Sequence, residues 1–548
     1  MLGVMIDCSR NAVLKPERVK EFAKIIRNMG YDTLMLYTED TYELESQPYF
    51  GHLRGKYTKE EIKDIDKYCA EIGIELIPCI QTLAHLNQMV KWAEEYWDII
   101  DWGNALLIGE EKTYDLIREM LKTISECFSS KKIHLGMDEA ANAGDLSGKY
   151  VQKHGIKDKF EMLNGHLHAV CDIAKECGLE PMIWSDMFVN YANRNGYYDE
   201  DCDKAKKEEF FKNAKLPEGV SLVCWDYYLK TKEEYVEKFN KNKMFGRKVS
   251  FAGGAWTWQG FAPYNSMSIA RTNLAMEACK ECGVEDILFT SWGDDGAECS
   301  PFTILPTLMF AAEKLNGNTD FESIKKKFYD IVGVDFDSFM LLEKLNYIGG
   351  AHTDPLKENI FENTDFTTNG GYTFNYGACK YLLYNDPFMG IRDAIASEAD
   401  NEYFANLSKQ INALDKGGFE LLFESYEKLC YALGVKAALG IKTRKAYQEN
   451  DKNALAEIVK EYDEAIERIK EFHQVYQARW FNDNKPHGFD VQDLRIGGIL
   501  QRLASCKARL EQFVAGTIEE IPELKENSLP PAMGTMKWNT CVSANIIA

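Results

Sequence analysis

Short apolar segments and longer amphipathic segments alternate over about the first 315 residues of the chain. The apolar segments do not alternate cleanly between polar and apolar positions, which is typical of parallel strands covered on both faces. Helical patterns follow most of them, for example at residues 16–29, 59–72 and 160–176. The predicted strands are residues 4–6, 33–37, 75–80, 132–139, 181–184, 220–224, 249–252 and 287–290.

Eight successive strand–helix units predict an α/β fold, a (β/α)8 TIM barrel formed by residues 1–315. A doubly wound open sheet is the structural alternative. Such a sheet does not bring all of its strand ends to one centre, and no glycine-rich phosphate fingerprint follows the first strand. In a barrel, the carboxyl ends of the strands build the active site, so the residues that follow each strand are the candidates for chemistry.

The pattern changes after about residue 316, where long amphipathic segments replace the strands. The clearest predicted helices are residues 419–442, 452–480 and 491–513. We predict a mainly α-helical C-terminal domain at residues 316–548 that ends in an extended tail from Ser528. Buttressing of the barrel is the simplest role for this domain; a homodimer interface and a wall of the active site are alternatives.

Asp138 and Glu139 end the fourth predicted strand. Two adjacent carboxylates repel each other, so at least one of them should resist ionisation. A carboxyl group that stays protonated near neutral pH is what a general acid requires. The same dipeptide occurs at Asp463–Glu464, but there it lies in a predicted helix, where solvated charge is the simpler interpretation.

Half of the chain's ten tryptophans lie at or just beyond predicted strand ends. These residues are Trp184, Trp225, Trp256, Trp258 and Trp292. Packing of the barrel would explain one such residue, but five at one rim indicate a binding surface. Flat aromatic faces beside carboxylates suit a sugar, whose C–H face stacks on an indole while its hydroxyl groups bond to the acids.

The sequence His134-Leu-Gly136-Met-Asp138-Glu139 resembles the signature of glycoside hydrolase family 20, the β-N-acetylhexosaminidases. The resemblance extends to Asp7-Cys-Ser-Arg10, Tyr37-Thr-Glu39-Asp40 and Trp292-Gly-Asp294, each after a predicted strand. It covers the barrel and is closest to the shorter branch of the family, which begins at the barrel and adds a helical C-terminal domain.

The resemblance implies substrate-assisted catalysis. Neighbouring residues on one strand are poorly placed to flank a glycosidic bond, as the acid and the nucleophile of an ordinary retaining glycosidase do. In the family, the 2-acetamido oxygen of the substrate is the nucleophile. Asp138 would orient the acetamido N–H and stabilise the oxazolinium ion, while Glu139 would protonate the leaving oxygen and then activate water.

The family also implies roles for residues at the other strand ends. Arg10 and Asp294 would bind the outer hydroxyl groups of the sugar, although glutamate is commoner than aspartate at the second position. Tyr227 or Tyr228 would donate to the acetamido oxygen. Surface exposure is the alternative for Arg10.

His85 would hydrogen-bond Glu139 and be oriented by Glu39 or Asp40. Ala84 replaces the glycine that usually precedes this histidine, so a core histidine is the alternative. His134 lies well before the end of its strand, and we expect it to be structural.

We expect Trp184, Trp256 and Trp292 to converge as a cage around the acetamido methyl group and the sugar face, with Trp225 at the same rim. Such a cage would form a closed pocket for one terminal sugar, and hence an exo-acting enzyme. Two alternatives remain at this point: a β-glycosidase that does not depend on the acetamido group, and a non-catalytic sugar-binding relative.

Composition narrows the other possibilities. The net charge of −22 argues against nucleic acids and anionic membrane surfaces as partners. No segment is long and apolar enough to span a membrane and no signal peptide is evident, so we expect a cytoplasmic protein with reduced thiols at its 15 scattered cysteines. No Walker motif, zinc spacing or dinucleotide fingerprint occurs, and we predict neither a cofactor nor a metal.

Overall fold

The computed structural model describes residues 1–199, 201–258, 260–347, 377–393 and 396–527, together with Trp538 and Ser543. The extended tail predicted from Ser528 lies outside the described residues, apart from those two positions. Within the described part of the chain, no helix is long and apolar enough to cross a membrane.

Eight parallel strands form a closed barrel in chain order, which confirms the predicted fold class. The first strand pairs with the second and also with the eighth, where Met5 lies opposite Thr290. The strands are β1 (Leu2–Asp7), β2 (Thr33–Tyr37), β3 (Glu75–Cys79), β4 (Lys132–His134), β5 (Glu180–Trp184), β6 (Ser221–Trp225), β7 (Val249–Gly254) and β8 (Ile287–Ser291).

Helices surround the barrel, and local sequence sets their ends. Helix α1 (Pro16–Met29) begins with a proline, whose fixed φ suits the first helical turn, and stops at Gly30, whose φ of +106° favours glycine. The other helices of this part are α2 (Lys59–Glu71), α3 (Asn87–Val90), α4 (Ala93–Tyr96), α5 (Glu111–Cys127), α6 (Lys149–His154), α7 (Lys159–Glu176), α8 (Asp186–Arg194), α9 (Lys204–Asn213), α10 (Lys232–Lys243), α11 (Asn265–Cys282) and α12 (Leu305–Leu315).

A separate apolar cluster fills the barrel interior. Its buried members are Met5, Met35, Tyr37, Ile77, Cys79, Met182, Trp184, Val223, Ala252 and Leu288. Tyr37 and Trp184 are the last residues of their strands, so they close the carboxyl end of this core. Trp225 and Trp292 pack against the cluster from above. The top layer of the core is therefore also the floor of the barrel mouth.

The strand predicted to end at Glu139 stops earlier, at His134. Gly136 and Met137 both have a φ of +75° and Glu139 has a φ of +46°, so the backbone leaves the extended conformation before the two acids. A Cβ atom on Gly136 would lie 2.1 Å from Oε1 of Gln81, and that same oxygen accepts a hydrogen bond from the amide of Met137. The carboxylates thus lie on a loop and escape the alternation of a strand.

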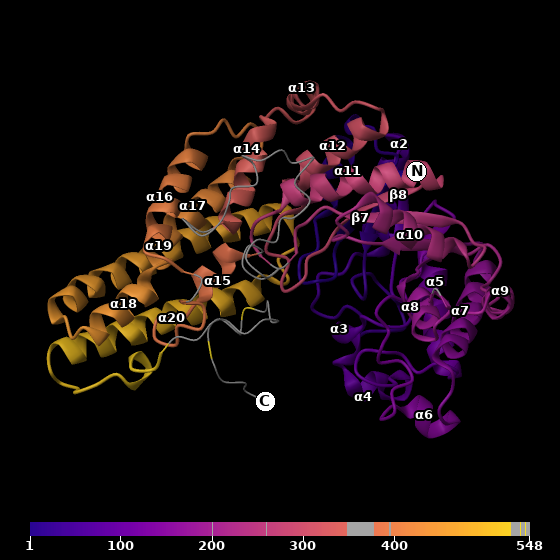
Figure 1. The fold of residues 1–548 in the computed structure, drawn as a ribbon, viewed down its shortest axis with the longest axis horizontal. Helices are drawn as coiled ribbons and strands as arrows, with labels where there is room; N and C mark the ends of the chain where they lie inside the picture. The colour runs from indigo at the N-terminus through magenta and orange to yellow at the C-terminus, as the bar shows by residue number, and fades with distance from the viewer. Residues whose placement is uncertain are drawn as a thin grey trace.

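The C-terminal region is helical, as predicted, and its long helices extend away from one side of the barrel (Figure 1). The segment predicted as one helix at residues 419–442 forms two helices, because Ala438, with φ −96° and ψ 2°, leaves the helical conformation. The helices are α13 (Phe321–Val332), α14 (Phe336–Leu341), α15 (Ala378–Tyr384), α16 (Ala399–Asn412), α17 (Glu420–Lys436), α18 (Leu439–Gln448), α19 (Lys452–Asp483) and α20 (Phe489–Val514). The domain boundary at residue 315 stays a prediction.

Candidate active site

A pocket of about 190 Å³ opens at the carboxyl end of the barrel. The residues predicted for the site line it except Glu39, Asp40 and Trp256, and Trp258, predicted at the rim but not in the cage, lines it as well. The lining residues are Arg10, His85, Asp138, Glu139, Trp184, Trp225, Tyr227, Tyr228, Trp258, Trp292 and Asp294.

The two acids have different surroundings. The carboxylate of Asp138 is buried and accepts a hydrogen bond of 2.7 Å from Nε2 of Gln81. Burial alone would raise the pKa of Asp138, but the neighbouring His85 and Gln81 hold it below its usual range. Asp138 is therefore the ionised member of the pair, and the expectation that at least one of the two acids resists ionisation stays a prediction. The Glu139 side chain, in contrast, is 61% exposed.

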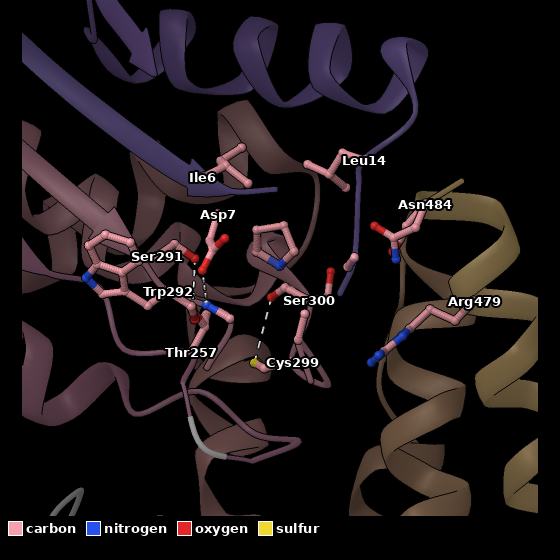
Figure 2. A pocket seen from close by; sticks show the side chains of 15 residues that line it. Ile6, Asp7, Leu14, Thr257, Ser291, Trp292, Cys299, Ser300, Arg479 and Asn484 are labelled. Carbon is pink, nitrogen blue, oxygen red and sulfur yellow. Dashed lines mark hydrogen bonds between the residues drawn. The ribbon is translucent and has the colours of Figure 1, made fainter. Parts of the chain in front are cut away.

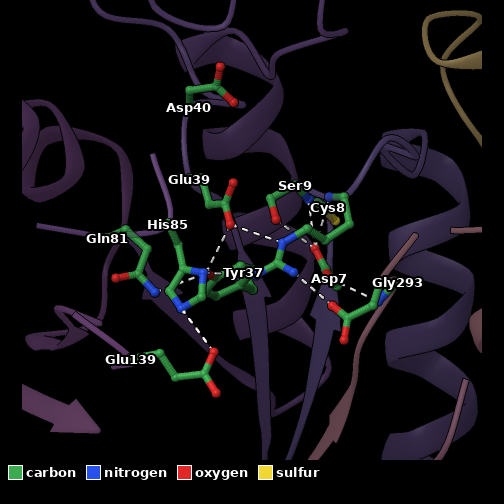
Figure 3. A network of polar contacts seen from close by, with 12 residues as sticks. Asp7, Cys8, Ser9, Tyr37, Glu39, Asp40, Gln81, His85, Glu139 and Gly293 are labelled. Carbon is green, nitrogen blue, oxygen red and sulfur yellow. Dashed lines mark hydrogen bonds and ion pairs between the residues drawn. The ribbon is translucent and has the colours of Figure 1, made fainter. Parts of the chain in front are cut away.

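One imidazole contacts both acids. Nε2 of His85 lies 3.3 Å from Oδ2 of Asp138 and 3.6 Å from Oε2 of Glu139, and Figure 3 shows the ring between Glu39 and Glu139. Burial disfavours a charged imidazole, but the Asp138 carboxylate outweighs it and raises the pKa of His85 to about 9. Asp40, proposed above as one possible orienting residue, instead pairs with Arg54 at 3.3 Å.

Arg10 lies beside His85, with 3.4 Å between its Nη2 and Nδ1 of the imidazole, and it links two further acids. Its Nε donates to Oε1 of Glu39 at 3.0 Å and its Nη1 donates to Oδ1 of Asp294 at 2.7 Å. Glu39 is buried and also accepts from the hydroxyl of Tyr37. Glu39 therefore holds the guanidinium from behind and does not line the pocket, whereas Asp294 does.

Aromatic side chains form the remaining wall and bond to one another through their polar atoms. Nε1 of Trp292 donates to the hydroxyl of Tyr227 at 2.8 Å, and Nε1 of Trp258 donates to the hydroxyl of Tyr228 at 3.3 Å. Trp225 stacks on Tyr227, with ring centroids 5.4 Å apart. These contacts fix the orientation of the rings.

Trp256 does not belong to the predicted cage. It is buried behind Trp258, with 4.1 Å between their ring centroids, and it does not line the pocket. A Cβ atom on Gly254 would lie 2.8 Å from the Trp258 ring, so the missing side chain lets that indole fold over the end of β7. Trp258 takes the predicted place of Trp256.

Two polar residues in the site had no predicted role. Gln81 bonds to Asp138, and Asp186 accepts a hydrogen bond of 3.1 Å from the amide of Glu139. Burial and the nearby Asp138 charge raise the pKa of Asp186 to about 7. Gln81 lies two residues beyond the end of β3 and Asp186 two residues beyond the end of β5, so their position after a strand was the available signal.

Residues 3–313 match the family described as "Glycosyl hydrolase family 20, catalytic domain", and residues 357–541 match the "Glycoside Hydrolase 20C C-terminal domain". Among curated relatives, hexosaminidase D from Bos taurus is 24% identical over 260 residues, which are 44% of this chain and 66% of that protein. Hexosaminidase D from Homo sapiens is 21% identical over 225 residues, 40% of this chain and 43% of that protein. The matches thus span less than two thirds of these relatives.

A solved structure of Flavobacterium johnsoniae chitobiase is 16% identical in sequence. The similarity covers 84% of this chain and 74% of that chain, with a TM-score of 0.45.

Proposed function

The chain belongs to glycoside hydrolase family 20, and on this premise we propose that it is an exo-acting, retaining β-N-acetylhexosaminidase. It removes a terminal β-linked N-acetylglucosamine or N-acetylgalactosamine. The observation that carries this proposal is the shared contact of Asp138 and Glu139 with His85 at one edge of an aromatic pocket.

The position of the two acids favours substrate-assisted catalysis. Because both carboxylates contact the same imidazole nitrogen, they approach a bound sugar from one side and do not flank the glycosidic bond. The 2-acetamido oxygen of the substrate then attacks the anomeric carbon and forms an oxazolinium ion. Asp138, whose pKa is held low, accepts the acetamido N–H and stabilises the positive charge of that ion.

Glu139 is the acid and the base of this reaction. It protonates the glycosidic oxygen as the bond to the anomeric carbon breaks, and it then takes a proton from the water that opens the oxazolinium ring. Its exposed side chain at the pocket mouth suits both steps, because the leaving group departs and the water arrives from that side. The amide of Glu139 is held by Asp186, which fixes the backbone from which the acid projects.

The rest of the pocket recognises one sugar. Arg10 and Asp294 bind its outer hydroxyl groups. Tyr227, which accepts from Trp292 and stacks on Trp225, donates to the acetamido oxygen. The volume of about 190 Å³ is below the roughly 300–1,000 Å³ of sites for drug-sized ligands, which favours a single ring over a cleft for a polymer.

A panel of 4-nitrophenyl β-glycosides tests the proposal. We expect turnover of the N-acetylglucosaminide or the N-acetylgalactosaminide and little turnover of the plain β-glucoside, with activity lost in Asp138→Asn. A thiazoline derived from N-acetylglucosamine should inhibit competitively and bind more tightly than the sugar product, because it mimics the cyclic intermediate. Comparable turnover of the plain glucoside would indicate a glycosidase without acetamido dependence, and binding without turnover would indicate a non-catalytic relative.

A further inference from the structure

The loop after β8, residues 292–298, carries Trp292 and Asp294 into the pocket and has an unusual backbone. Asp295, Gly296 and Ala297 have φ values of +55°, +115° and +53°. Residues other than glycine rarely adopt this left-handed conformation, and they keep it only where their surroundings hold them.

Two cations from the C-terminal helices hold this loop. Lys380 on α15 is fully buried, and its Nζ contacts Oδ2 of Asp295 at 2.8 Å and Oε2 of Glu298 at 2.7 Å. Arg495 on α20 donates through Nη1 to the carbonyl of Asp295 at 2.7 Å and to Oε1 of Glu298 at 2.9 Å. Its Nη2 donates to Oδ1 of Asp295 at 3.2 Å. Two buried cations thus balance one buried acid, Glu298, and one partly buried acid, Asp295.

Helices α19 and α20 also hold the peptide groups of the loop. Nε2 of Gln492 on α20 donates to the carbonyl of Gly296 at 2.9 Å, and Nη2 of Arg479 on α19 donates to the carbonyl of Glu298 at 2.7 Å. A Cβ atom on Gly296 would lie 2.5 Å from Nη1 of Arg495, so the missing side chain leaves room for the guanidinium group against the loop.

Arg10, which pairs with Asp294, is also held in place through contacts with the C-terminal region. Asn11, which follows Arg10, has a φ of +104°, and its Nδ2 donates to the carbonyls of Gly488 at 2.8 Å and Gly296 at 3.3 Å. Gly488 is the residue before α20. Each partner of the pair is therefore followed by a left-handed residue that contacts the C-terminal region.

A small cavity of about 30 Å³, lined by both polar and apolar residues, lies between the ends of β1 and β8 and helix α19. Figure 2 shows Arg479 and Asn484 on one side of this cavity and Asp7 and Ser291 on the other. Behind the pocket, the barrel thus meets the C-terminal helices partly through polar contacts, and the ion pairs of the loop carry the specific alignment.

We propose that Lys380 and Arg495 are positioning residues, which hold the loop of residues 292–298 so that Asp294 meets Arg10 and the outer hydroxyl groups of the sugar are recognised. This inference rests on the proposed function, since it assigns the C-terminal helices a part in the specificity of the same site. N-acetylglucosamine and N-acetylgalactosamine differ only in the orientation of one outer hydroxyl group. A displaced Asp294 therefore changes binding and the preference between these sugars more than it changes the chemical step.

The variant Arg495→Lys tests this proposal. It keeps the charge, but one ammonium group cannot serve the acceptors that the guanidinium fork serves. We expect KM to rise about tenfold, the effect of one lost hydrogen bond to a charged group, with kcat changed less than about threefold. The ratio of kcat/KM for the N-acetylglucosaminide and the N-acetylgalactosaminide should shift, and amide hydrogen exchange should rise at residues 292–298.

Arg502→Lys is the matched control. Arg502 lies two turns further along α20 and pairs with Asp386 at 2.5 Å, within the C-terminal region and away from the loop. It should leave KM, the sugar preference and exchange at residues 292–298 unchanged. Lys380→Met should act in the same direction as Arg495→Lys and more strongly; if it does not fold, Arg495→Lys still decides the question.

Wild-type values for all three readouts in Arg495→Lys would overturn the proposal, as would equal changes in Arg502→Lys. If the wild-type protein hydrolyses neither sugar, the proposed function fails, but the exchange measurement still tests the contact. Faster exchange at residues 292–298 in Arg495→Lys but not in Arg502→Lys would support the proposal that Arg495 holds the loop. Unchanged exchange in Arg495→Lys would refute it.

Discussion

At the scale of single residues, the carboxyl groups beneath the pocket differ because of what surrounds each of them. His85 and Gln81 lower the pKa of Asp138, while burial raises the pKa of Asp186 to about 7. Sequence adjacency suggested that Asp138 and Glu139 set each other's ionisation, but the partners that matter for Asp138 come from the loop after β3. Such long-range contacts leave no local signal in the sequence.

Replacement of Glu139 by glutamine should lower kcat/KM by roughly 10²–10⁴-fold for substrates with poor leaving groups, because protonation of the glycosidic oxygen is lost. The loss should be smaller for activated aryl glycosides, whose oxygen needs less help. Rates for a series of aryl N-acetylglucosaminides of different leaving-group pKa measure this difference. An equal loss across the series would argue against Glu139 as the acid.

The pairing of His85 predicts a dependence of stability on pH. Its folded pKa of about 9 lies above the ordinary value of 6.5, so its contribution is complete below pH 6.5 and is lost as the pH rises through 9. Between pH 7 and pH 9.5, this contribution to the free energy of unfolding should fall by about 2–3 kcal/mol.

Denaturant titrations at these two pH values measure the change. His85→Asn should reduce the fall by about 2–3 kcal/mol, whereas His168→Asn, at an exposed histidine, should leave it unchanged. Burial raises the pKa of thiols such as Cys8 and Cys79, and these add a fall of their own that is common to all three proteins. Asp186 does not obscure the comparison, because its raised pKa of about 7 acts mainly between pH 3.8 and 7. A wild-type protein equally stable at both pH values would contradict the His85–Asp138 ion pair.

At the scale of elements, hydrophobic patterning was sufficient to predict the strands of the barrel, but it did not predict the conformation of the residues at the barrel's rim. All eight strands lie where their apolar segments predicted, because each segment must be buried on both faces. The fourth is shorter than predicted, since Gly136 and Met137 adopt left-handed conformations that depend on contact with Gln81. Similarly, Trp256 and Trp258 both follow β7, and the sequence does not reveal which of them turns into the pocket.

The position of Trp258 after β7 predicts that this pocket tryptophan binds the sugar, whereas an exposed tryptophan outside the pocket does not. Trp258→Ala should weaken the binding of N-acetylglucosamine by about 1–3 kcal/mol through lost stacking and burial. Trp102→Ala, at a half-exposed tryptophan outside the pocket, should leave binding unchanged. Isothermal titration with the sugar compares the two variants. Equal affinities in both would remove Trp258 from the binding wall.

At the scale of the whole molecule, a helical C-terminal region was predictable from its long amphipathic segments, but its connection to the site was not. The segment containing Lys380 has no strong pattern of its own, and its partners Asp295 and Glu298 lie more than 80 residues earlier in the chain. A buried ion pair between segments so far apart becomes visible only in three dimensions.

This connection predicts that the barrel and the C-terminal helices unfold together. Breaking the contact would leave buried charges without partners, which is strongly unfavourable. Thermal unfolding followed by near-ultraviolet circular dichroism, which reports the packed aromatic side chains, should therefore coincide with unfolding followed at 222 nm, which is dominated by helix. Two separated transitions would show that the two parts are thermodynamically independent.

The pairing of Lys380 and Arg495 with the loop after β8 also limits the modularity of the protein. A shortened chain that ended near Leu315 would keep every strand of the barrel but lose both cations, leaving Asp295 and Glu298 to repel each other beside the pocket. An exchange of C-terminal regions between related proteins faces the same restriction unless the loop is transferred with its counter-charges. For engineering, the smallest transferable unit is thus the barrel together with the helices that neutralise it.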